Sequence, residues 1–375
     1  MNKITIIGAS FAALAAARRL RRLDASAAIT LVAPRPELVY LPSLIWLPSG
    51  QRRAADLVVP LDRFLRRHEL AFRAARATGV EAGGRRLLTS EGALDNDGLI
   101  VACGGRFIKK LPGIEQAILP CEGIAPVEKL RQALAGLERG TIALGFAGNP
   151  NEPTAMRGGP IFEFLFGIDT QLRREGRRER IELVFFNPMT RPGNRLGEKA
   201  VQRLMDEMAR RNIVTRLGHK LVGFEPGRVR TEGGDFAADL VVFMPGLTGN
   251  AWFDDTDLPR SPGGLLKADA QCRVEGRERL YVAGDAGSFP GPDWLPKQAH
   301  MAEAQAVTAA ENLAAELAGR TPTATFKPEL LCIVDSLDAG MLVRRTASGG
   351  MALPPLGLMH TAKSAFEKLY LRRYR

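Results

Sequence analysis

Short apolar runs that each stop at a glycine are the repeating feature of this chain. The run at 4–7 ends at Gly8 before an alanine-rich segment, and the run at 280–283 ends at Gly284 before another, 301–317. A strand buried on both faces of a parallel sheet is apolar throughout, whereas a helix covering the sheet repeats its apolar residues every three or four positions. The alternation therefore predicts an α/β fold with parallel sheets.

The turn after the first run is a candidate nucleotide site. A strand, a tight turn and a helix N-terminus leave free backbone N–H groups that favour an anion. In the fingerprint G-x-G-x-x-G/A, Gly8 takes the first glycine position, Ser10 replaces the second and Ala13 takes the third. The Cβ of Ser10 would crowd a phosphate, and strand 29–32 ends at Ala33 instead of the acid that holds a ribose. This motif alone fits an ordinary strand-turn-helix unit as well as a nucleotide site.

A second nucleotide site midway along the chain is not predicted. The run 140–146 is a strand candidate, but the loop after it contains Pro150, Pro153 and Pro160, and no glycine fingerprint opens the next helix. Proline has no backbone N–H to donate, so this loop cannot wrap a pyrophosphate closely. We therefore expect no NADH or NADPH site in this half of the chain.

Length and composition narrow the class of protein. With 375 residues, of which 45% are hydrophobic, the chain can bury two cores. No run reaches the ~20 apolar residues that span a bilayer, and we expect no cleavable signal peptide because residues 1–3 lead directly into a strand. The four cysteines lie far apart without a CxxC motif, which excludes a disulfide scaffold and a zinc site. Most arginines lie on predicted helix faces, and no motif accompanies the net charge of +11, so we expect no nucleic-acid partner.

Several further segments resemble a known family. They are the Gly8 turn, 38–46 with Pro42-Ser43, 98–105 with Ala102-Cys103-Gly104, 158–164, Gly284-Asp285, 296–298, 332–335 and 361–368. Together they resemble the sulfide:quinone oxidoreductase branch of the two-dinucleotide-fold flavoproteins, in the pyridine nucleotide-disulfide oxidoreductase superfamily. The resemblance runs through almost the whole chain.

The resemblance implies an α/β fold of two interleaved Rossmann-like domains with a C-terminal amphipathic, membrane-associating extension. The FAD-binding domain would comprise 1–110 and 240–320, the second Rossmann-like domain 111–239, and the membrane- and quinone-associated region 321–375. FAD is the implied cofactor. The residues expected to contact it are Gly8, Ser10, Phe11, Ala12, Ala33, Pro34, Pro42, Ser43, Ala102, Cys103, Gly104, Gly284, Asp285 and Lys297.

The cysteines are the implied sulfide-reactive groups. In the family a hydrosulfide attacks a cysteine bridge, and two electrons pass through the flavin to a quinone. Cys121 resembles the first of three family cysteines and Cys332 the last, but the middle position holds Arg157. This chain must therefore pair Cys121 with Cys332, recruit Cys103 or use another arrangement. A low-pKa thiolate suits such exchange, whereas a buried free cysteine is usually only a small apolar residue.

Three further side chains are candidates for proton and charge handling. Glu163 stands at the start of the helix after the proline loop and is the best acid for proton delivery, although an acid there also suits the helix dipole. The resemblance assigns Lys297 to stabilising negative charge on the reduced flavin, the alternative being a solvent-exposed lysine. His300 is a weaker candidate for a proton relay.

The last residues predict an amphipathic helix. Apolar residues with helical spacing fall on one face, with basic residues on the other, as in helices that lie in the headgroup plane of a membrane. The apolar residues are Met359, Ala362, Phe366, Leu369 and Tyr370. The alternatives are a dimerisation helix and a helix folded onto the core. The sequence leaves open whether the protein forms a homo-oligomer. The preceding segment 349–356 is interpreted as a mobile apolar connector near a quinone channel.

The predicted function is an FAD-dependent sulfide:quinone oxidoreductase, with sulfide, a quinone and the membrane surface as partners and a peripheral membrane location. A type II NADH:quinone dehydrogenase-like enzyme is an alternative that the proline-rich loop disfavours. A flavocytochrome c sulfide dehydrogenase-type subunit is disfavoured by the amphipathic tail. A non-catalytic flavin-binding protein stays open because Ser10 and Arg157 both depart from the family pattern.

Overall fold

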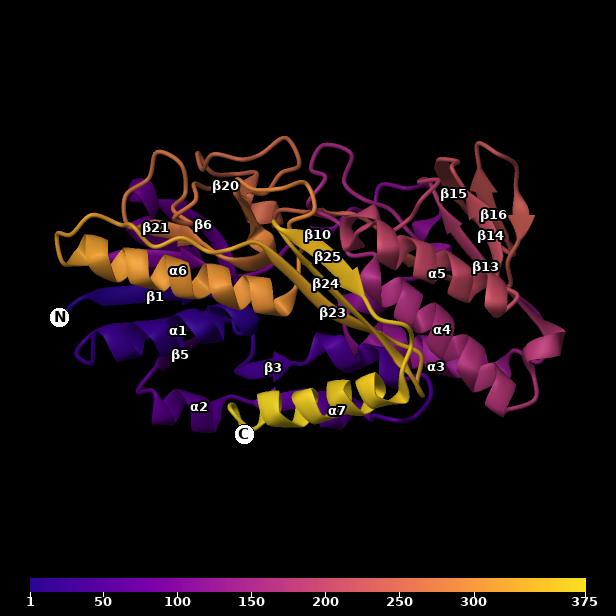
Figure 1. Ribbon diagram of the computed structural model, residues 1–375. Helices are drawn as coiled ribbons and strands as arrows, with labels where there is room; N and C mark the ends of the chain where they lie inside the picture. The colour runs from indigo at the N-terminus through magenta and orange to yellow at the C-terminus, as the bar shows by residue number, and fades with distance from the viewer.

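A parallel five-stranded sheet forms the first lobe of the molecule, on the left of Figure 1. The structure is a computed structural model that describes residues 1–375. The strand order β21-β9-β1-β2-β5 puts β1 in the centre of the sheet. Strands β2 and β5, which come next in the chain, lie on one side of β1, and the later strands β9 and β21 lie on the other. Helices α1 and α6 pack against each other on this sheet. The elements are β1 Lys3–Ile7, α1 Phe11–Leu23, β2 Ala28–Ala33, β5 Ala71–Ala74, β9 Gly98–Val101, β21 Leu280–Val282 and α6 Ala299–Leu317.

A second parallel sheet, β11-β18-β12-β13-β14, forms the other lobe. Strand β18 pairs with both β11 and β12, so the chain leaves this sheet after Met244 and not at residue 239. The elements are β11 Ala117–Ile118, α3 Ile124–Gly136, β12 Gly140–Phe146, α4 Gly159–Arg174, β13 Ile181–Asn187, α5 Glu198–Arg210, β14 Val214–Leu217 and β18 Leu240–Met244. The two parallel sheets confirm the predicted α/β architecture.

Both lobes also carry smaller antiparallel sheets. They are β3 Glu37–Val39 with β4 Val58–Pro60, β6 Ala77–Glu81 with β7 Arg86–Thr89 and β8 Gly92–Asp95, and β15 Leu221–Glu225 with β16 Arg228–Thr231 and β17 Phe236–Ala237. The short helix α2 covers Asp62–Arg67, and the 3-10 helices η1, η5 and η7 cover Leu41–Trp46, Pro120–Glu122 and Asn194–Leu196.

The C-terminal region crosses from one lobe to the other, as the yellow elements of Figure 1 show. It forms an antiparallel sheet of β23 Glu329–Asp335, β24 Gly340–Thr346 and β25 Gly349–Ala352, followed by helix α7, Gly357–Leu371. The interpretation of 349–356 as a connector is wrong for its first half. There β25 continues the sheet, because its backbone pairs with β24 from Thr346↔Gly349 to Val343↔Ala352.

Two apolar cores hold the lobes, and the C-terminal region contributes to both. Tyr370, Leu371 and Tyr374 belong to the core of the first lobe. Val334 and Val343, from β23 and β24, belong to the core of the second. Burying a large side chain typically contributes about 1.5–3 kcal/mol, so the C-terminal region is part of the folded body.

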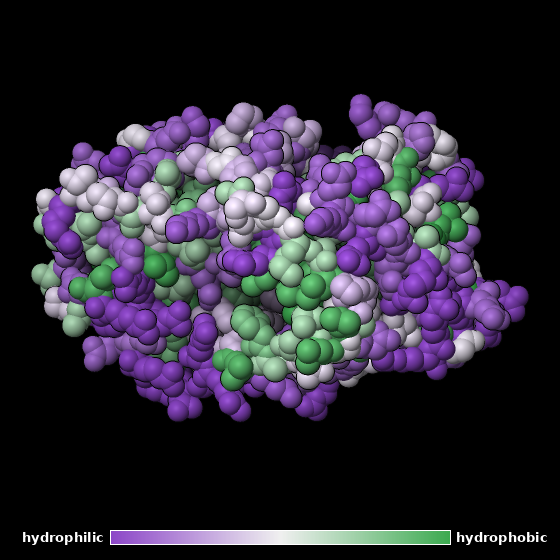
Figure 2. Space-filling view, viewed as in Figure 1, coloured by the Kyte–Doolittle hydropathy of each residue, from purple (hydrophilic) through white to green (hydrophobic).

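Helix α7 buries only part of its apolar face. Tyr370 is 4% exposed and faces the core, whereas Phe366 and Leu369 are 58% and 60% exposed. Phe366 and Tyr370, four positions apart, lie on the same side of the helix with ring centroids 6.0 Å apart, but the body of the protein covers this side only at Tyr370. Figure 2 shows apolar residues gathered on the surface over the C-terminal elements. The exposed members are Leu331, Met351, Leu356, Leu358, Phe366 and Leu369. No helix of the structure is long and apolar enough to cross a membrane.

Candidate active site

The Gly8 turn lies where β1 meets β9, at the crevice of the first sheet. Gly8 has φ +126°, and a Cβ there would lie 2.4 Å from the carbonyl oxygen of Ala102. Only glycine therefore fits. Ser10 precedes α1 without capping it, and the first intrahelical bond runs from Leu14 N to Ser10 O (3.0 Å). The N–H groups at Phe11 and Ala12 thus have no partner within the helix, and such groups can receive a phosphate.

The end of β2 holds no carboxylate for a ribose. Ala33 is the last residue of the strand, and Pro34 follows it. The nearby Arg35 pairs with Glu37 at 2.9 Å on the surface. These residues lie beside the Gly8 turn, since β2 pairs with β1 in parallel register up to Ile7↔Val32.

The Gly284-Asp285 turn comes to the same crevice. Gly284 has φ +73° and donates its N–H to Gln305 Oε1 at 3.0 Å. The Asp285 carboxylate is 9% exposed and forms an ion pair with Arg157. The Arg157 side chain, at the position of the missing middle cysteine, therefore reaches the aspartate expected to hold the ribityl chain. No local pattern signals that these two residues pair, because 127 residues lie between them in the chain.

Lys297 lies just before α6, with its ammonium group turned inward. It donates to the carbonyl of Gly287 and lies 5.8 Å from the centre of the Phe289 ring. Burial lowers the pKa of Lys297 to about 8, and Asp285 opposes that shift. Lys297 is thus not the solvent-exposed lysine of the alternative interpretation. His300, the second residue of α6, forms a hydrogen bond with the carbonyl of Glu329 at 3.0 Å, and burial lowers its pKa.

Cys121 and Cys332 share one environment that Cys103 does not. Both pack against the core of the second lobe, and Glu163 affects the pKa of both thiols. Cys103 packs against the first core, where Asn250 Nδ2 lies 3.2 Å from its sulfur. All four cysteines, with the buried Cys272, are free thiols in the structure. The arrangement favours Cys121 with Cys332 over the recruitment of Cys103.

The candidate thiols are not low-pKa groups in this structure. Burial raises the pKa of Cys103, Cys121 and Cys332 to about 12. Two cations oppose burial: Arg157 lowers the pKa of Cys121, and Lys363 lowers that of Cys332. Formation of a thiolate at Cys121 or Cys332 therefore depends on the positive charges of Arg157 and Lys363.

A buried polar network joins α4, β23 and α7 beside the thiols. Glu163 pairs with Lys363 and accepts the N–H of Asp335 at 3.1 Å. The Asp335 carboxylate accepts from Trp46 Nε1 at 3.0 Å and lies 2.7 Å from His360 Nδ1. Burial raises the pKa of Glu163 even though Lys363 opposes the shift. A buried carboxyl with a raised pKa is the kind of group that serves as a general acid or base. Asp335, His360 and Lys363 were not predicted as site residues, because only the fold brings them to Glu163.

The segment with Pro42 and Ser43 lies at the boundary between the lobes. Both residues belong to η1, where Ser43 is 1% exposed. Tyr40, just before η1, forms an aromatic cluster with Phe11 and Tyr370, at centroid distances of 5.5 to 5.9 Å. The cluster joins α7 to the start of α1.

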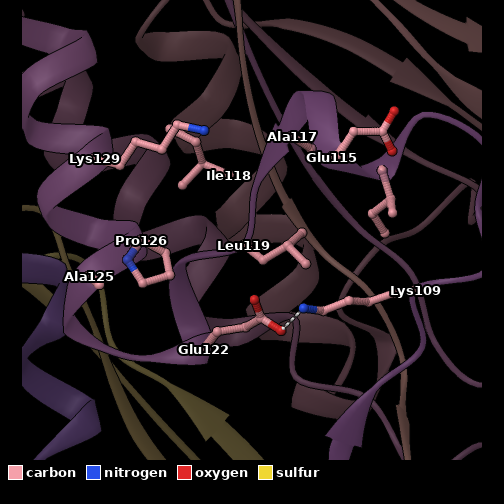
Figure 3. A pocket seen from close by; sticks show the side chains of 10 residues that line it. Lys109, Glu115, Ala117, Ile118, Leu119, Glu122, Ala125, Pro126 and Lys129 are labelled. Carbon is pink, nitrogen blue, oxygen red and sulfur yellow. Dashed lines mark ion pairs between the residues drawn. The ribbon is translucent and has the colours of Figure 1, made fainter.

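A separate cavity lies beside the turn that carries Cys121. It has a volume of about 440 Å³ and is lined by residues of η5 and α3. Two of its charged residues, Lys109 and Glu122, form an ion pair at 2.5 Å (Figure 3). The other two, Lys129 and Glu115, carry opposite charges, so the lining is neutral as a whole. Cys121 is not among the lining residues.

The residues of the crevice fit FAD. Gly104 has φ +73° with open space where its Cβ would lie, so the backbone is accessible there. Two buried polar atoms, Arg157 Nε and Gln298 Oε1, have no hydrogen-bond partner. Buried polar atoms normally find a partner, and the polar edge of a flavin offers both donors and acceptors. FAD bound here would also meet Asp285 and the free N–H groups before Leu14.

A family model described as pyridine nucleotide-disulphide oxidoreductase matches residues 2–306. The chain belongs to this family. A sulfide-quinone reductase of Aquifex aeolicus is 23% identical over 99% of this chain and 91% of its own length. An NADH dehydrogenase-like protein of Mycobacterium tuberculosis is 27% identical over 77% of this chain and 73% of its own length.

Solved structures agree with this family fold. The sulfide:quinone oxidoreductase of Aquifex aeolicus superposes with a TM-score of 0.90 at 22% identity, covering 100% of this chain and 92% of that one. Putidaredoxin reductase in complex with putidaredoxin gives 0.72 at 18% identity, with 92% and 82% covered. The protein is therefore an FAD-dependent oxidoreductase with the two-dinucleotide-fold architecture. The individual site residues stay predictions.

Proposed function

We propose that the protein is a sulfide:quinone oxidoreductase in which Cys121 and Cys332 handle sulfur. The observation that carries the proposal is the common environment of these two thiols around Glu163. The sulfide-quinone reductase relative, which matches nearly the full chain, supports the same substrate pair.

The chain's own residues can support the sulfur step. With Cys121 and Cys332 bridged, a hydrosulfide attacks one sulfur, the S–S bond breaks, and the other cysteine leaves as a thiolate. Burial opposes that thiolate, so Arg157 and Lys363 are needed to stabilise it. Bound FAD would supply the two-electron chemistry that links sulfide oxidation to quinone reduction.

Protons would be handled by the network around Glu163. A quinone takes up two protons with its two electrons, and Glu163 is a buried carboxyl with a raised pKa. Lys363 and His360, which contact Glu163 and Asp335, lie on α7 and are partly exposed, so they can pass protons between this network and the surface. We assign Glu163 as the proton donor and Lys363 as the group that tunes it.

The membrane surface is the proposed source of the quinone. The exposed apolar side chains of α7 and its neighbouring strands lie beside the basic residues Lys368, Arg372 and Arg373. Apolar anchors next to basic residues favour the interface of an anionic membrane. This arrangement supports a peripheral location, with α7 lying on the lipid.

Anaerobic titration of the holoprotein tests the proposal. Sulfide should bleach the flavin absorbance within the mixing time of a stopped-flow experiment, and NADH at the same concentration should not. The NADH dehydrogenase-like relatives make NADH the specific competing substrate. Rapid bleaching by NADH alone would reject sulfide in favour of a type II NADH:quinone enzyme.

A further inference from the structure

A second cavity opens at the carboxyl ends of β12 and β13. Its volume is about 720 Å³, and it lies between the lobes, next to the loop that precedes α6 and to strand β24. The crevice beyond the carboxyl ends of parallel strands is the usual ligand site of such sheets. The lining residues that matter here are Asn149, Met156, Arg195, Asp293, Trp294 and Arg345.

Arg195 brings an uncompensated positive charge into this cavity. Its Nη1 donates to the carbonyls of Thr154 and Met156 at 3.2 and 3.0 Å, and its Nη2 donates to those of Trp294 and Leu295, while its Nε is buried without a partner. It forms no ion pair with any carboxylate. Burial and the neighbouring Arg345 lower the pKa of Arg195 to about 10, and Asp285 raises it. A buried guanidinium without a counter-ion is costly unless an anion joins it.

Arg345 is a second cation of this cavity without a carboxylate partner. Its guanidinium stacks over the Trp294 ring at 4.9 Å and donates to the carbonyl of Arg195 at 2.9 Å. No carboxylate pairs with it: Asp293 lines the cavity but is exposed and forms no ion pair. In the smaller cavity two lysines are balanced by two glutamates, and Lys109 pairs with Glu122. The larger cavity instead holds two guanidinium groups and only one acid, the exposed Asp293.

We propose that this cavity binds a small oxyanion between Arg195 and Arg345. Arg345 donates only through Nη1, so its Nε and Nη2 can form paired, charge-assisted hydrogen bonds to a planar or tetrahedral oxyanion, and Arg195 adds its charge. The same oxygen chemistry is found in a free sulfur or phosphorus oxyanion and in the phosphate of a nucleotide. The proline-containing loop 147–158 carries no nucleotide fingerprint, so the ligand is the free oxyanion. The site goes beyond sulfide and quinone and does not depend on either.

Calorimetric titration of the holoprotein with sulfite, with phosphate and with ADP-ribose tests the site. Sulfite or phosphate should bind saturably, and Arg345→Met should weaken binding by about tenfold or more, since a hydrogen bond to a charged group contributes about 1.5–3 kcal/mol. Arg344→Met is the matched control, because Arg344 neighbours Arg345 on β24 but pairs with Glu329 at 2.8 Å on the surface. The control should bind like the wild type.

Other outcomes overturn the proposal. Equal affinity in Arg345→Met and Arg344→Met, or no saturable binding of either free oxyanion, rejects the site. Binding of ADP-ribose alone, with the same dependence on Arg345, assigns the cavity to a nucleotide phosphate and rejects the free oxyanion. Arg345→Lys keeps the positive charge but loses the forked geometry of the guanidinium, so it should bind the oxyanion with intermediate affinity. This variant replaces Arg345→Met in the test if Arg345→Met folds poorly. Flavin bleaching by sulfide in the same variants reports separately on the proposed function.

Discussion

The ammonium group of Lys363 and the carboxylate of Glu163 form an ion pair that joins the C-terminal helix α7 to the start of α4. Their side chains are 15% and 11% exposed, so the pair lies mostly away from water. Two further contacts bind the same helix to the body: Arg52 to Glu367 at 2.5 Å, and Tyr370 to Glu303 at 2.6 Å. Helix α7 therefore completes the site as well as supplying a surface patch.

Breaking the Lys363–Glu163 pair should weaken the fold and the reaction together. Lys363→Met leaves Glu163 without its counter-charge, and removing one partner of a buried pair typically costs about 3 kcal/mol. Glu163 would then hold its proton to higher pH, because Lys363 is the main group lowering its pKa. We expect a lower melting temperature and a pH profile of quinone reduction shifted upward. Lys199→Met, at an exposed position of α5, is the control and should change neither.

The assignment of Cys121 and Cys332 as the sulfur-handling pair predicts different outcomes for three cysteine variants. Cys121→Ser and Cys332→Ser should each abolish flavin bleaching by sulfide, since a serine cannot hold a sulfane sulfur or leave as a thiolate. Cys103→Ser should retain it, because Cys103 lies against the other core. Stopped-flow absorbance under anaerobic conditions measures all three. Full activity in Cys121→Ser would instead indicate Cys103 or single-cysteine chemistry.

Asp285 should control flavin content. Asp285→Ala removes the expected ribityl contact and also leaves Arg157 unpaired in the crevice. We expect FAD occupancy, measured as flavin absorbance per protein, to fall several-fold. Asp293→Ala removes an exposed acid from a nearby loop and serves as the control. Full occupancy in Asp285→Ala would show that the ribityl contact has been assigned to the wrong residue.

Lys297 should give the flavin-free protein a distinctive pH dependence. Its folded-state pKa of about 8 lies below the ordinary value of 10.5. Between these values the unfolded chain holds more protons than the folded one, so the free energy of unfolding rises with pH. In urea unfolding between pH 8 and pH 10, the free energy of unfolding of the wild type should rise with pH relative to that of Lys297→Met. Lys327→Met, which removes an exposed lysine, is the control for the loss of one positive charge. Parallel curves for wild type and Lys297→Met would contradict a buried lysine.

The membrane contact is best tested on the outer face of α7. Deleting 357–375 would also remove Lys363, Glu367 and Tyr370, so it should lower both stability and flavin content. The double variant Phe366→Asn with Leu369→Asn changes only exposed positions and should weaken liposome binding at least tenfold, since each buried side chain contributes about 1.5–3 kcal/mol. Its melting temperature should match the wild type.

Tyr370→Ala supplies the opposite control for the membrane experiment. It removes a core side chain and should cost about 3 kcal/mol without reducing liposome binding. High salt should weaken the binding of all forms, because basic residues flank the apolar ones. Equal sedimentation of the wild type and the double variant at both salt concentrations would exclude this face as the anchor.

The sequence by itself determined the local pieces of this protein. Continuous apolar runs specified buried parallel strands, and Gly8 marked a turn that no other residue can form beside Ala102. These features depend on neighbours along the chain, so periodicity and turn chemistry reveal them. The two-lobed FAD-binding architecture was implied by the family resemblance of these segments.

Only the tertiary structure decided which distant groups meet. It paired Arg157 with Asp285, brought Lys363 to Glu163, and separated Cys103 from Cys121 and Cys332. It also split the apolar positions of α7 between the core and the surface, because helical spacing shows which side chains share a side but not how much of that side the body covers. Contacts between residues far apart in sequence depend on how the sheets pack, and local pattern carries no information about that packing.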